Sequence, residues 1–402
     1  DGGLYMPEAF ENCYASLNKA NASLHSIAEN LISPFLNSFF SDDEIREIIA
    51  QSFTFDVPLV ELNDSLFIAE LFHGPTLAFK DFGGQFLGNV LSRILAKKNE
   101  KLTILVATSG DTGGAVASGF FGKENIDVVI LYPKGKVSPL QELQLTTWGG
   151  NIRAVCVDGT FDDCQRLVKT AFSDNELSEK LNLSSANSIN IGRLIPQMIY
   201  YGFVSHQIYA RFKEMPTIVV PSGNFGNITA GLFVQQMGYP IYHFIAATNA
   251  NDVVPKYLEN GNYEPKPSVR TLSNAMDVGA PSNMERIEDL FAHNIEEIKA
   301  HISAISVNDE QTKATIKSVF EKHNYIADPH TAVGIFAAEL VAKNDLAIVL
   351  STAHPAKFKE EVEAILQREI SLPKQLSALL EKTAEKFEIS GSYEEMKSYL
   401  LK

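Results

Sequence analysis

The chain has 402 residues, of which 45% are hydrophobic, and its formal net charge at pH 7 is −15. This acidic balance, without a stripe of clustered lysine and arginine, argues against binding to the phosphate backbone of nucleic acids. No run approaches the roughly 20 consecutive apolar residues of a membrane span, and no basic-then-apolar leader opens the chain, so we expect a cytoplasmic protein that does not bind membranes.

The cysteines and histidines show no spacing that is typical of a metal site. Cys13, Cys156 and Cys164 form no C-x-x-C pair, and their odd number fits a reduced compartment. The nine histidines include no H-E-x-x-H motif, so we expect no metal requirement. The absence of a G-x-x-x-x-G-K-[ST] string argues against a nucleotide phosphotransferase.

Taken in chain order, the predicted elements indicate an α/β fold. Residues 1–75 are expected to form a mostly helical region, with polar breaks at Asn21 and at Ser41, where a helix N-cap is predicted. A further helix is predicted to start just past Lys80 and to run toward Lys98. Strand-like runs then alternate with helical patterns, at 103–107, 128–131, 154–157, 217–220, 244–247 and 346–350. Such alternation predicts parallel strands that are joined by crossover helices.

Two α/β lobes are expected after the helical region, because single hydrophobic cores stop growing near roughly 250–300 residues. The first lobe is predicted to span 76–215 and the second 216–402. Between about residues 260 and 283 the chain is rich in Pro, Ser, Asn and Gly, which predicts a long loop. A helical excursion at about 285–325 and C-terminal helices are expected to complete the second lobe.

One lysine stands in an unusual setting. The segment 73–84, His-Gly-Pro-Thr-Leu-Ala-Phe-Lys-Asp-Phe-Gly-Gly, sets Lys80 between Phe79 and Phe82. Apolar rings disfavour the charged form of an amine by desolvation, so the neutral and nucleophilic form becomes accessible. Such an amine can condense with an aldehyde. The alternative is a solvated lysine that opens a helix, with both phenylalanines facing the core.

Three loops of small polar residues each follow a strand-like run, at 108–114, 222–227 and 351–358. In open α/β sheets the ligand crevice lies at the carboxyl ends of the strands, so these segments are expected to be binding loops. The sequence Gly-Asn-Phe-Gly-Asn at 223–227 predicts a phosphate cup, because glycine lets the backbone approach an anion and the following helix directs N–H groups at the same point. The alternative for any one such loop is a tight strand-to-helix turn without a ligand.

Together with Ser-Ala-Asn-Ser-Ile-Asn-Ile at 185–191 and Ser-Asn-Ala-Met-Asp at 273–277, these segments resemble the threonine synthase family of fold-type II pyridoxal-phosphate enzymes. They occur in the family's order and cover nearly the whole chain. The resemblance implies a fold-type II architecture, with two open α/β lobes of mostly parallel sheets plus a helical N-terminal region, and pyridoxal 5'-phosphate as cofactor. The family normally carries a further stretch before the position of Asp1, so we expect that an upstream segment is missing.

The resemblance also assigns residues to the cofactor. Lys80 is expected to be the Schiff-base lysine and, once released, the general base at the substrate Cα. Thr352 is expected to be the partner of the pyridine nitrogen. Asp111 stands where related enzymes often have Asn, and a carboxylate would repel an ionised phenolate, so Asp111 is only a candidate for contact with the cofactor. The cofactor phosphate is expected in a cup formed by Ser222, Gly223, Asn224, Phe225, Gly226 and Asn227.

Two further sets of residues are expected to bind the substrate. Thr108, Ser109 and Thr112 match the family positions that hold the amino-acid carboxylate, and their alternative is an ordinary capped helix terminus. A second set, Asn187, Ser188 and Arg193, matches the phosphate-binding positions, where the planar fork of an arginine can grip two phosphate oxygens. The alternative for Arg193 is a surface arginine on a helix.

The reaction that the resemblance implies is the conversion of O-phospho-L-homoserine and water to L-threonine and phosphate. We expect the protein to be a monomer or a homodimer. Three alternatives stay open at this point. A phospho-lyase of the same fold would release a keto acid instead of threonine. A relative of cysteine synthase or threonine dehydratase would have no use for the second set of residues, and a catalytically inactive relative would only bind ligands.

Overall fold

The computed structural model describes residues 3–108, 110–342 and 345–401. The chain divides into two compact units, each assembled from separate stretches of sequence. The first unit contains 1–46, 55–74 and 194–371, and the second contains 47–54, 75–193 and 372–402. These boundaries differ from the expected ranges 1–75, 76–215 and 216–402, because 194–215 packs with the first unit and the C-terminal segment packs with the second.

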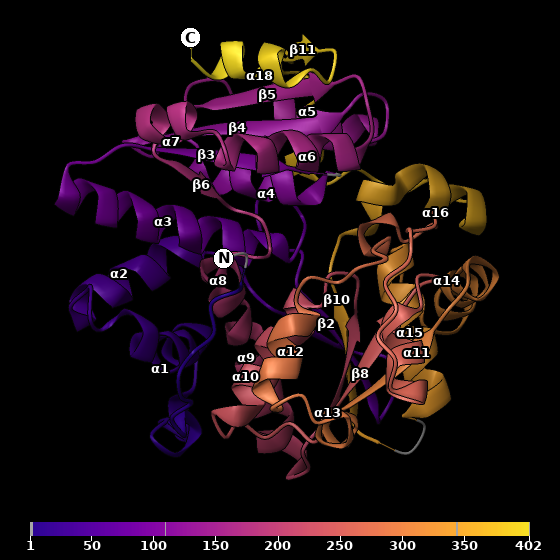
Figure 1. The fold of residues 1–402 in the computed structure, drawn as a ribbon. Helices are drawn as coiled ribbons and strands as arrows, with labels where there is room; N and C mark the ends of the chain where they lie inside the picture. Colours follow the sequence, from indigo (N-terminus) through magenta and orange to yellow (C-terminus); the bar gives the residue numbers. More distant parts are fainter. Residues whose placement is uncertain (1–2, 109, 343–344, 402) are drawn as a thin grey trace. The chain divides into compact units, whose positions relative to one another are not determined.

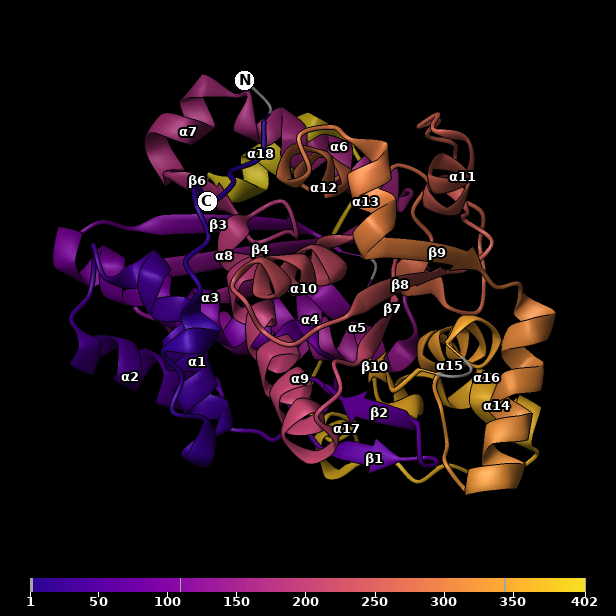
Figure 2. The same ribbon diagram turned by 90° about the horizontal axis from the view of Figure 1, so that it is seen from below.

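The first unit is built on a sheet in which β1 and β2 are antiparallel and every other described pair is parallel, in the order β1-β2-β10-β7-β8-β9. Figure 2 lets this order be followed, with α14, α15 and α16 on one side of the sheet and α9 and α10 on the other. The elements are α1 (Leu24–Leu36), α2 (Asp42–Ser52, which continues into the second unit), β1 (Leu59–Glu61), β2 (Leu66–Glu70), α8 (Ile191–Leu194, which begins in the second unit), α9 (Met198–Phe212), β7 (Thr217–Pro221), α10 (Gly226–Gln236), β8 (His243–Thr248), α11 (Val253–Asn260), α12 (Met284–Leu290), α13 (Ile295–His301), β9 (Ile302–Ser306), α14 (Asp309–His323), α15 (Pro329–Val341), β10 (Ala347–Ser351) and α16 (Lys359–Leu366).

The second unit is built on a sheet whose described strand pairs are all parallel, in the order β11-β5-β4-β3-β6. Apart from α17, which is labelled in Figure 2, its helices and strands can be followed in Figure 1. They are α3 (Lys80–Lys98), β3 (Leu102–Ala107), α4 (Asp111–Phe120), β4 (Ile126–Pro133), α5 (Pro139–Thr146), β5 (Ile152–Val157), α6 (Phe161–Phe172), α7 (Asn175–Leu181), β6 (Leu183–Ser185), α17 (Lys374–Ser377), β11 (Phe387–Ile389) and α18 (Tyr393–Leu400).

Alternate residues of β3 face opposite layers of helices, as the two-residue period of a strand requires. Ile104 and Val106 pack with apolar residues of α3, α4 and α5 on one face. Leu105 and Ala107 pack with apolar residues of α6, α7 and α18 on the other. This burial on both faces explains why the run 103–107 is continuously apolar apart from its first residue.

All six predicted strands are present and all are parallel to their predicted neighbours, which confirms the α/β fold. The predicted helix after residue 80 begins at Lys80, and α2 begins directly after Ser41, whose hydroxyl accepts a hydrogen bond from the Glu44 N–H. None of the helices in the described residues combines the length and the apolar character that a membrane crossing requires.

Five strands were not predicted: β1, β2, β6, β9 and β11. Four of them, β1, β6, β9 and β11, lie at the edge of a sheet, and three of these four have only three residues. Their local preference for the strand conformation is weak, so pairing with distant segments decides their structure. β9 therefore interrupts the expected helical excursion at 285–325, and β11 interrupts the expected C-terminal helices. β1 and β2 likewise add strands to the expected helical N-terminal region.

Helices α3 and α4 pack at a contact where glycine is required. A Cβ at Gly119 would lie 2.2 Å from the carbonyl oxygen of Gly84, and a Cβ at Gly84 would lie 2.3 Å from the carbonyl oxygen of Ala115. Because both obstacles are backbone atoms, a methyl group at either position would push the two helices apart. Gly114 lies on the same helix α4, but there a Cβ would meet only the Gln144 side chain, at 3.4 Å.

We therefore expect Gly119→Ala to lower the free energy of unfolding by about 1–3 kcal/mol, the usual cost of overpacking. Gly114→Ala is the matched control, and alanine there should be neutral or stabilise by about 0.5–1 kcal/mol because it favours the helix. Urea denaturation followed by circular dichroism measures both. Equal effects of the two substitutions would contradict the close contact.

Candidate active site

The loop after β7 carries the predicted phosphate cup at one edge of the sheet. Parallel strands β10, β7 and β8 all end at this edge. Ser222 extends the pairing, because its N–H donates to the carbonyl of Ala247 at 2.8 Å. At Gly223 a Cβ would lie 2.7 Å from the Cα of Met276, so only glycine fits. Phe225 has a φ of 61°, and this left-handed conformation turns the chain into α10.

The N-terminus of α10 offers backbone donors to an anion. The first N–H groups of a helix have no acceptor within the helix. Among the described residues, none accepts a hydrogen bond from the backbone N–H of Phe225, Gly226 or Asn227. The aligned peptide dipoles add a partial positive charge at the same end. This arrangement fits a phosphate group.

Asn227 adds a side-chain donor to this terminus. Its Oδ1 accepts hydrogen bonds from the hydroxyls of Tyr200 and Tyr201, at 2.6 and 2.7 Å. Burial raises the pKa of both phenols well above the usual value, so they remain donors. The amide is thereby fixed with Nδ2 directed elsewhere, and this buried nitrogen has no hydrogen-bond partner among the described residues. A buried donor without an acceptor is costly, and an anion would supply one.

Thr352 lies at the same edge of the same sheet. It directly follows β10, the strand adjacent to β7, and it is 7% exposed. Ser351 before it shares a hydrogen bond of 2.7 Å with the hydroxyl of Thr331 on α15, which anchors the end of the strand. The structure therefore groups Thr352 with residues 222–227 in the first unit.

Lys80 is the first residue of α3, in the second unit. Its side chain is half-buried, and Nζ lies 5.7 Å from the centre of the Phe79 ring. Phe82 is fully buried and stacks on Phe53, with ring centres 5.7 Å apart. One of the two phenylalanines thus borders the amine, and the other belongs to the core.

The segment before Lys80 is held by a buried carboxylate that the sequence analysis did not single out. Asp81 accepts hydrogen bonds from the backbone N–H and the hydroxyl of Thr76, at 2.8 and 2.6 Å. Gln144 on α5 donates to the Thr76 carbonyl at 3.0 Å. Between them, Leu77 has a φ of 58°, a strained conformation for a residue other than glycine. The position of Asp81 next to Lys80 was the only sequence signal for this role.

The loop after β3 leads into the N-terminus of α4. The hydroxyl of Thr108 accepts hydrogen bonds from the N–H groups of Gly110 and Gly113, at 3.0 and 2.8 Å. The carboxylate of Asp111 accepts one from the Gln141 amide at 3.0 Å. Thr108 thus has the capping role that was its alternative interpretation, which leaves its hydroxyl hydrogen available to a ligand. Thr112 is half-buried on the first turn of α4, and Ser109 lies outside the described residues.

Asn187 and Ser188 follow β6, which is adjacent to β3, so they lie at the same sheet edge as Thr108. Asn187 Nδ2 donates to the carbonyl of Ala107 at 3.0 Å, and its Oδ1 accepts from the hydroxyl of Ser185 at 3.1 Å. Ser188 is half-buried. The structure therefore places Thr108, Asn187 and Ser188 at one sheet edge of the second unit.

Arg193 is buried, at 4% exposure, so it is not the surface arginine of the alternative interpretation. Nη1 donates to the carbonyl of Ala186 at 2.6 Å, and Nε lies 2.5 Å from where a Cβ on Gly83 would be. Burial lowers its pKa to about 10, and the opposite charge of Asp81 counteracts part of this shift. The guanidinium is still charged at pH 7, and it fixes the start of the 186–190 loop.

No group of three or more His, Cys, Asp or Glu side chains is arranged to bind a metal ion in residues 3–108, 110–342 and 345–401.

Sequence reasoning also missed a polar network beside the cup. His330 and Asp328 share a hydrogen bond of 2.6 Å, and His330 Nε2 accepts one from the N–H of Ala275, at 3.2 Å. Ala275 belongs to the segment 273–277, which packs on Gly223.

Comparisons with known proteins agree over the length of the chain. The family model described as pyridoxal-phosphate dependent enzyme matches residues 53–349, and that of the threonine synthase C-terminal region matches residues 331–400. Threonine synthase of Haemophilus influenzae is 43% identical to this chain, with 100% of this chain and 94% of that protein covered. Threonine synthase of Escherichia coli K12 is 47% identical, and the match covers 86% of this chain and 80% of that protein.

Solved structures give the same result. The crystal structure of threonine synthase from Escherichia coli has a TM-score of 0.91 at 41% identity, and it covers 100% of this chain and 94% of its own. The crystal structure of pyridoxal-phosphate-bound threonine synthase from Brucella melitensis has a TM-score of 0.92 at 35% identity. The match covers 100% of this chain and 93% of that chain.

The environment of Asn227 leads to a prediction. In Asn227→Asp the two tyrosine hydroxyls can still donate to the side chain, but a carboxylate oxygen replaces the free Nδ2 donor. A negative charge beside a phosphate group costs several kcal/mol, so we expect the affinity for pyridoxal phosphate to fall by about 100-fold or more. Fluorescence titration of the cofactor-free protein measures this, and Asn262→Asp in the exposed loop after α11 is the control. Unchanged affinity would place the phosphate elsewhere.

Proposed function

This chain belongs to the threonine synthase family of pyridoxal-phosphate dependent enzymes, and we propose that it converts O-phospho-L-homoserine and water to L-threonine and phosphate. The observation that carries the proposal is the 43% identity to the Haemophilus influenzae threonine synthase across the whole chain. The cofactor is pyridoxal phosphate. The donors at the N-terminus of α10 support its binding, since they suit a phosphate group.

We propose the following roles toward the cofactor. Residues 222–227 would hold its phosphate, and the hydroxyl of Thr352 would serve its pyridine nitrogen. Lys80 would hold the cofactor covalently through its aldehyde. When bound, the cofactor supplies an electron sink that stabilises negative charge at the substrate Cα.

Lys80 also serves as the general base in this proposal. With the cofactor bound, the free amine of Lys80 would take the proton from the substrate Cα. The overall reaction also requires loss of a Cβ proton, departure of phosphate from Cγ, protonation of Cγ, addition of the hydroxyl group of water at Cβ and return of a proton to Cα. The two hydrogen bonds from Thr76 to the Asp81 carboxylate keep Leu77 in its strained conformation. They thereby limit where the Lys80 amine can move.

The substrate is held at its two anionic ends. Thr108, Ser109 and Thr112 bind the carboxylate in this proposal, helped by the partial positive charge at the N-terminus of α4. Asn187, Ser188 and Arg193 bind the phosphate that leaves. Asp111, already engaged by the Gln141 amide, is the remaining candidate for contact with the cofactor ring.

The direct test is to mix the purified protein with pyridoxal phosphate and O-phospho-L-homoserine, and to assay threonine and phosphate together. Equal amounts of both are expected. Release of phosphate with a keto acid would instead identify a phospho-lyase, and no release of phosphate would indicate a relative that does not catalyse this reaction.

Lys80→Ala should remove the visible absorbance of the covalently held cofactor and lower turnover by about 10⁴-fold or more, because one substitution removes both the anchor and the base. Lys98→Ala is the matched control, since it lies exposed at the other end of α3. A Lys80→Ala protein that kept the absorbance and the turnover would refute the assignment.

Arg193→Leu should lower kcat/KM for the phosphorylated substrate by the equivalent of about 2–5 kcal/mol, the usual cost of removing one partner of a buried charge pair. Because Arg193 also packs within the fold, the cofactor affinity and the midpoint of urea unfolding are measured in the same variant. Lost kcat/KM with retained cofactor affinity supports a role at the substrate phosphate. Unchanged kinetics would mean that the phosphate binds elsewhere.

A further inference from the structure

A second buried arginine lies on α12, in the first unit. Arg286 is 1% exposed, which is rare for a guanidinium because burial of an unpaired charge is costly. Its Nε donates to the backbone carbonyl of Tyr5 at 3.1 Å, and its Nη1 donates to Oδ1 of Asn283 at 2.5 Å. The arginine therefore joins the N-terminal segment to the residue that precedes α12.

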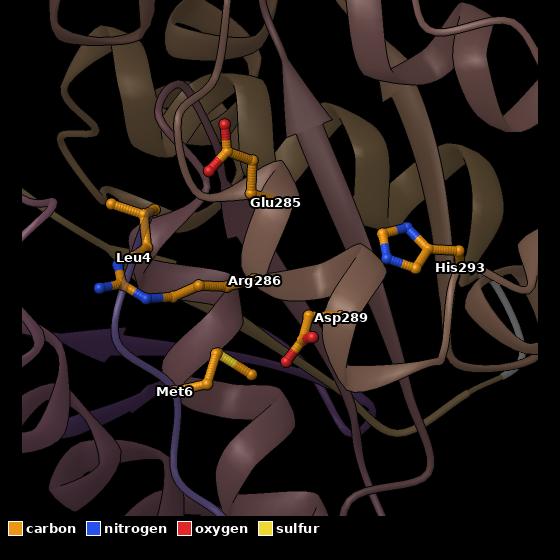
Figure 3. A pocket seen from close by; sticks show the side chains of 6 residues that line it. All are labelled: Leu4, Met6, Glu285, Arg286, Asp289 and His293. Atoms are coloured by element: carbon orange, nitrogen blue, oxygen red, sulfur yellow. The ribbon is translucent and has the colours of Figure 1, made fainter. Parts of the chain in front are cut away.

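Figure 3 shows the Arg286 side chain directed toward Leu4 and Met6, away from the helix that carries it. These residues line a pocket of about 300 Å³ together with Glu285, Asp289 and His293. The guanidinium thus forms part of the pocket wall, while its Nη1 is turned inward to Asn283. Lining a pocket does not require the hydrogen bond from Arg286 to the buried Asn283, so this hydrogen bond is expected to have a separate role.

The contact fixes the orientation of the Asn283 amide. A guanidinium can only donate hydrogen bonds, so the oxygen of the amide must face Arg286 and the nitrogen must face the other way. That nitrogen, Nδ2, donates to the backbone carbonyl of Asn224 at 2.9 Å. The backbone N–H of Ser282 donates to the side-chain oxygen of the same Asn224, at 2.7 Å. Asn283 is fully buried, so water does not compete for these groups.

The direction of the Asn224 carbonyl decides the direction of the next N–H group. In a planar trans peptide the C=O of one residue and the N–H of the next point opposite ways, and the described residues contain no cis peptide. Because Asn283 holds the carbonyl of Asn224, the N–H of Phe225 points away from Asn283. It is the first of the three backbone donors at the start of α10 that have no acceptor among the described residues.

We propose that Arg286 is a positioning residue for the cofactor phosphate, which acts through Asn283 to aim the backbone donors of the phosphate loop. The inference rests on the proposed assignment of residues 222–227 to that phosphate. Arg286 holds the Asn283 amide, the amide holds the Asn224 carbonyl, and the peptide plane presents the Phe225 N–H. Without Arg286 the amide of Asn283 could turn over, and its oxygen would then repel the carbonyl that it now holds.

This role also explains the long segment 261–283, which the sequence analysis left without a function. Its middle meets Gly223 through Ala275 and Met276, and its C-terminal end meets Asn224 through Ser282 and Asn283. The segment therefore braces the phosphate loop at two points. Its middle is tied down by the carboxylate of Asp277, which accepts hydrogen bonds from the N–H and hydroxyl of Thr271.

The test uses three variants of the full chain. Arg286→Met removes the donors and keeps the length of the side chain. Asn283→Asp keeps the shape and can pair with Arg286, but its side chain cannot donate to the carbonyl of Asn224, which keeps only the longer hydrogen bond of 3.4 Å from the backbone N–H of residue 283. Arg270→Met is the matched control, because Arg270 lies exposed in the same segment. The dissociation constant of pyridoxal phosphate is measured by fluorescence titration of the cofactor-free proteins, together with the urea midpoint, and kcat and KM are measured at saturating cofactor.

We expect Arg286→Met and Asn283→Asp to weaken cofactor binding by about 10- to 100-fold, the usual effect of losing an orienting partner. At saturating cofactor, kcat and the KM for substrate should return to within a few-fold of the parent, because the residues that act on substrate are unchanged. Arg286→Lys, which keeps a donor, should recover part of the cofactor affinity. Arg270→Met should change none of these quantities.

The inference fails if Asn283→Asp and Arg286→Met bind the cofactor as tightly as the parent, whatever their stability. A lower urea midpoint with unchanged cofactor affinity would show that Arg286 has only a structural role. These outcomes are distinct from failure of the proposed function, which would appear in the parent protein itself as no cofactor binding or no threonine. If Arg286→Met does not fold, Asn283→Asp decides the question, because it retains a partner for the arginine.

Discussion

The backbone carbonyl of Asn224 is held by the Asn283 amide, and the proposed binding of a phosphate by residues 222–227 depends on this hydrogen bond. With the carbonyl fixed and Phe225 in the left-handed region, the chain enters α10 with its first N–H groups free of acceptors among the described residues. A chain with a net charge of −15 cannot attract an anion by its overall field. Fixed dipoles at one helix end therefore supply the local positive potential, and they do so without a mobile lysine.

Each unit places its candidate residues by the same rule. In the first, parallel strands β7 and β10 end at one edge, and the loops after them carry residues 222–227 and Thr352. In the second, β3 and β6 end at one edge, and the loops after them carry Thr108, Asn187 and Ser188. Parallel sheets bring the carboxyl ends of distant segments together, so residues far apart in sequence become neighbours once the strand order is set.

This rule explains how far the sequence could be interpreted. Long apolar runs such as 103–107 and 217–220 predict strands, and polar loops after them predict binding sites, because both signals are local. Strands such as β9 and β11 are short, and they depend on pairing with distant segments more than on their weak local preference. The burial of Arg193 has the same origin, since the acceptor of its Nη1 and the glycine beside it become neighbours only in the fold. Local pattern left open whether Thr108 caps a helix or binds a ligand, and the fold shows that its hydroxyl accepts hydrogen bonds from two N–H groups at the start of α4.

The two buried arginines illustrate why such residues escape sequence reasoning and yet matter for function. Arg193 donates to the carbonyl of Ala186, at the start of one candidate loop, and Arg286 donates to Asn283, beside the other. In each unit, burial lowers the pKa of the guanidinium, because desolvation disfavours its charged form. A guanidinium is planar and rigid, and it can donate hydrogen bonds but not accept them. It can therefore determine which way a neighbouring carbonyl or amide faces. Burying the charge costs free energy of folding. In this interpretation, the benefit is a loop that is already oriented before the ligand binds, which lowers the free-energy cost of binding.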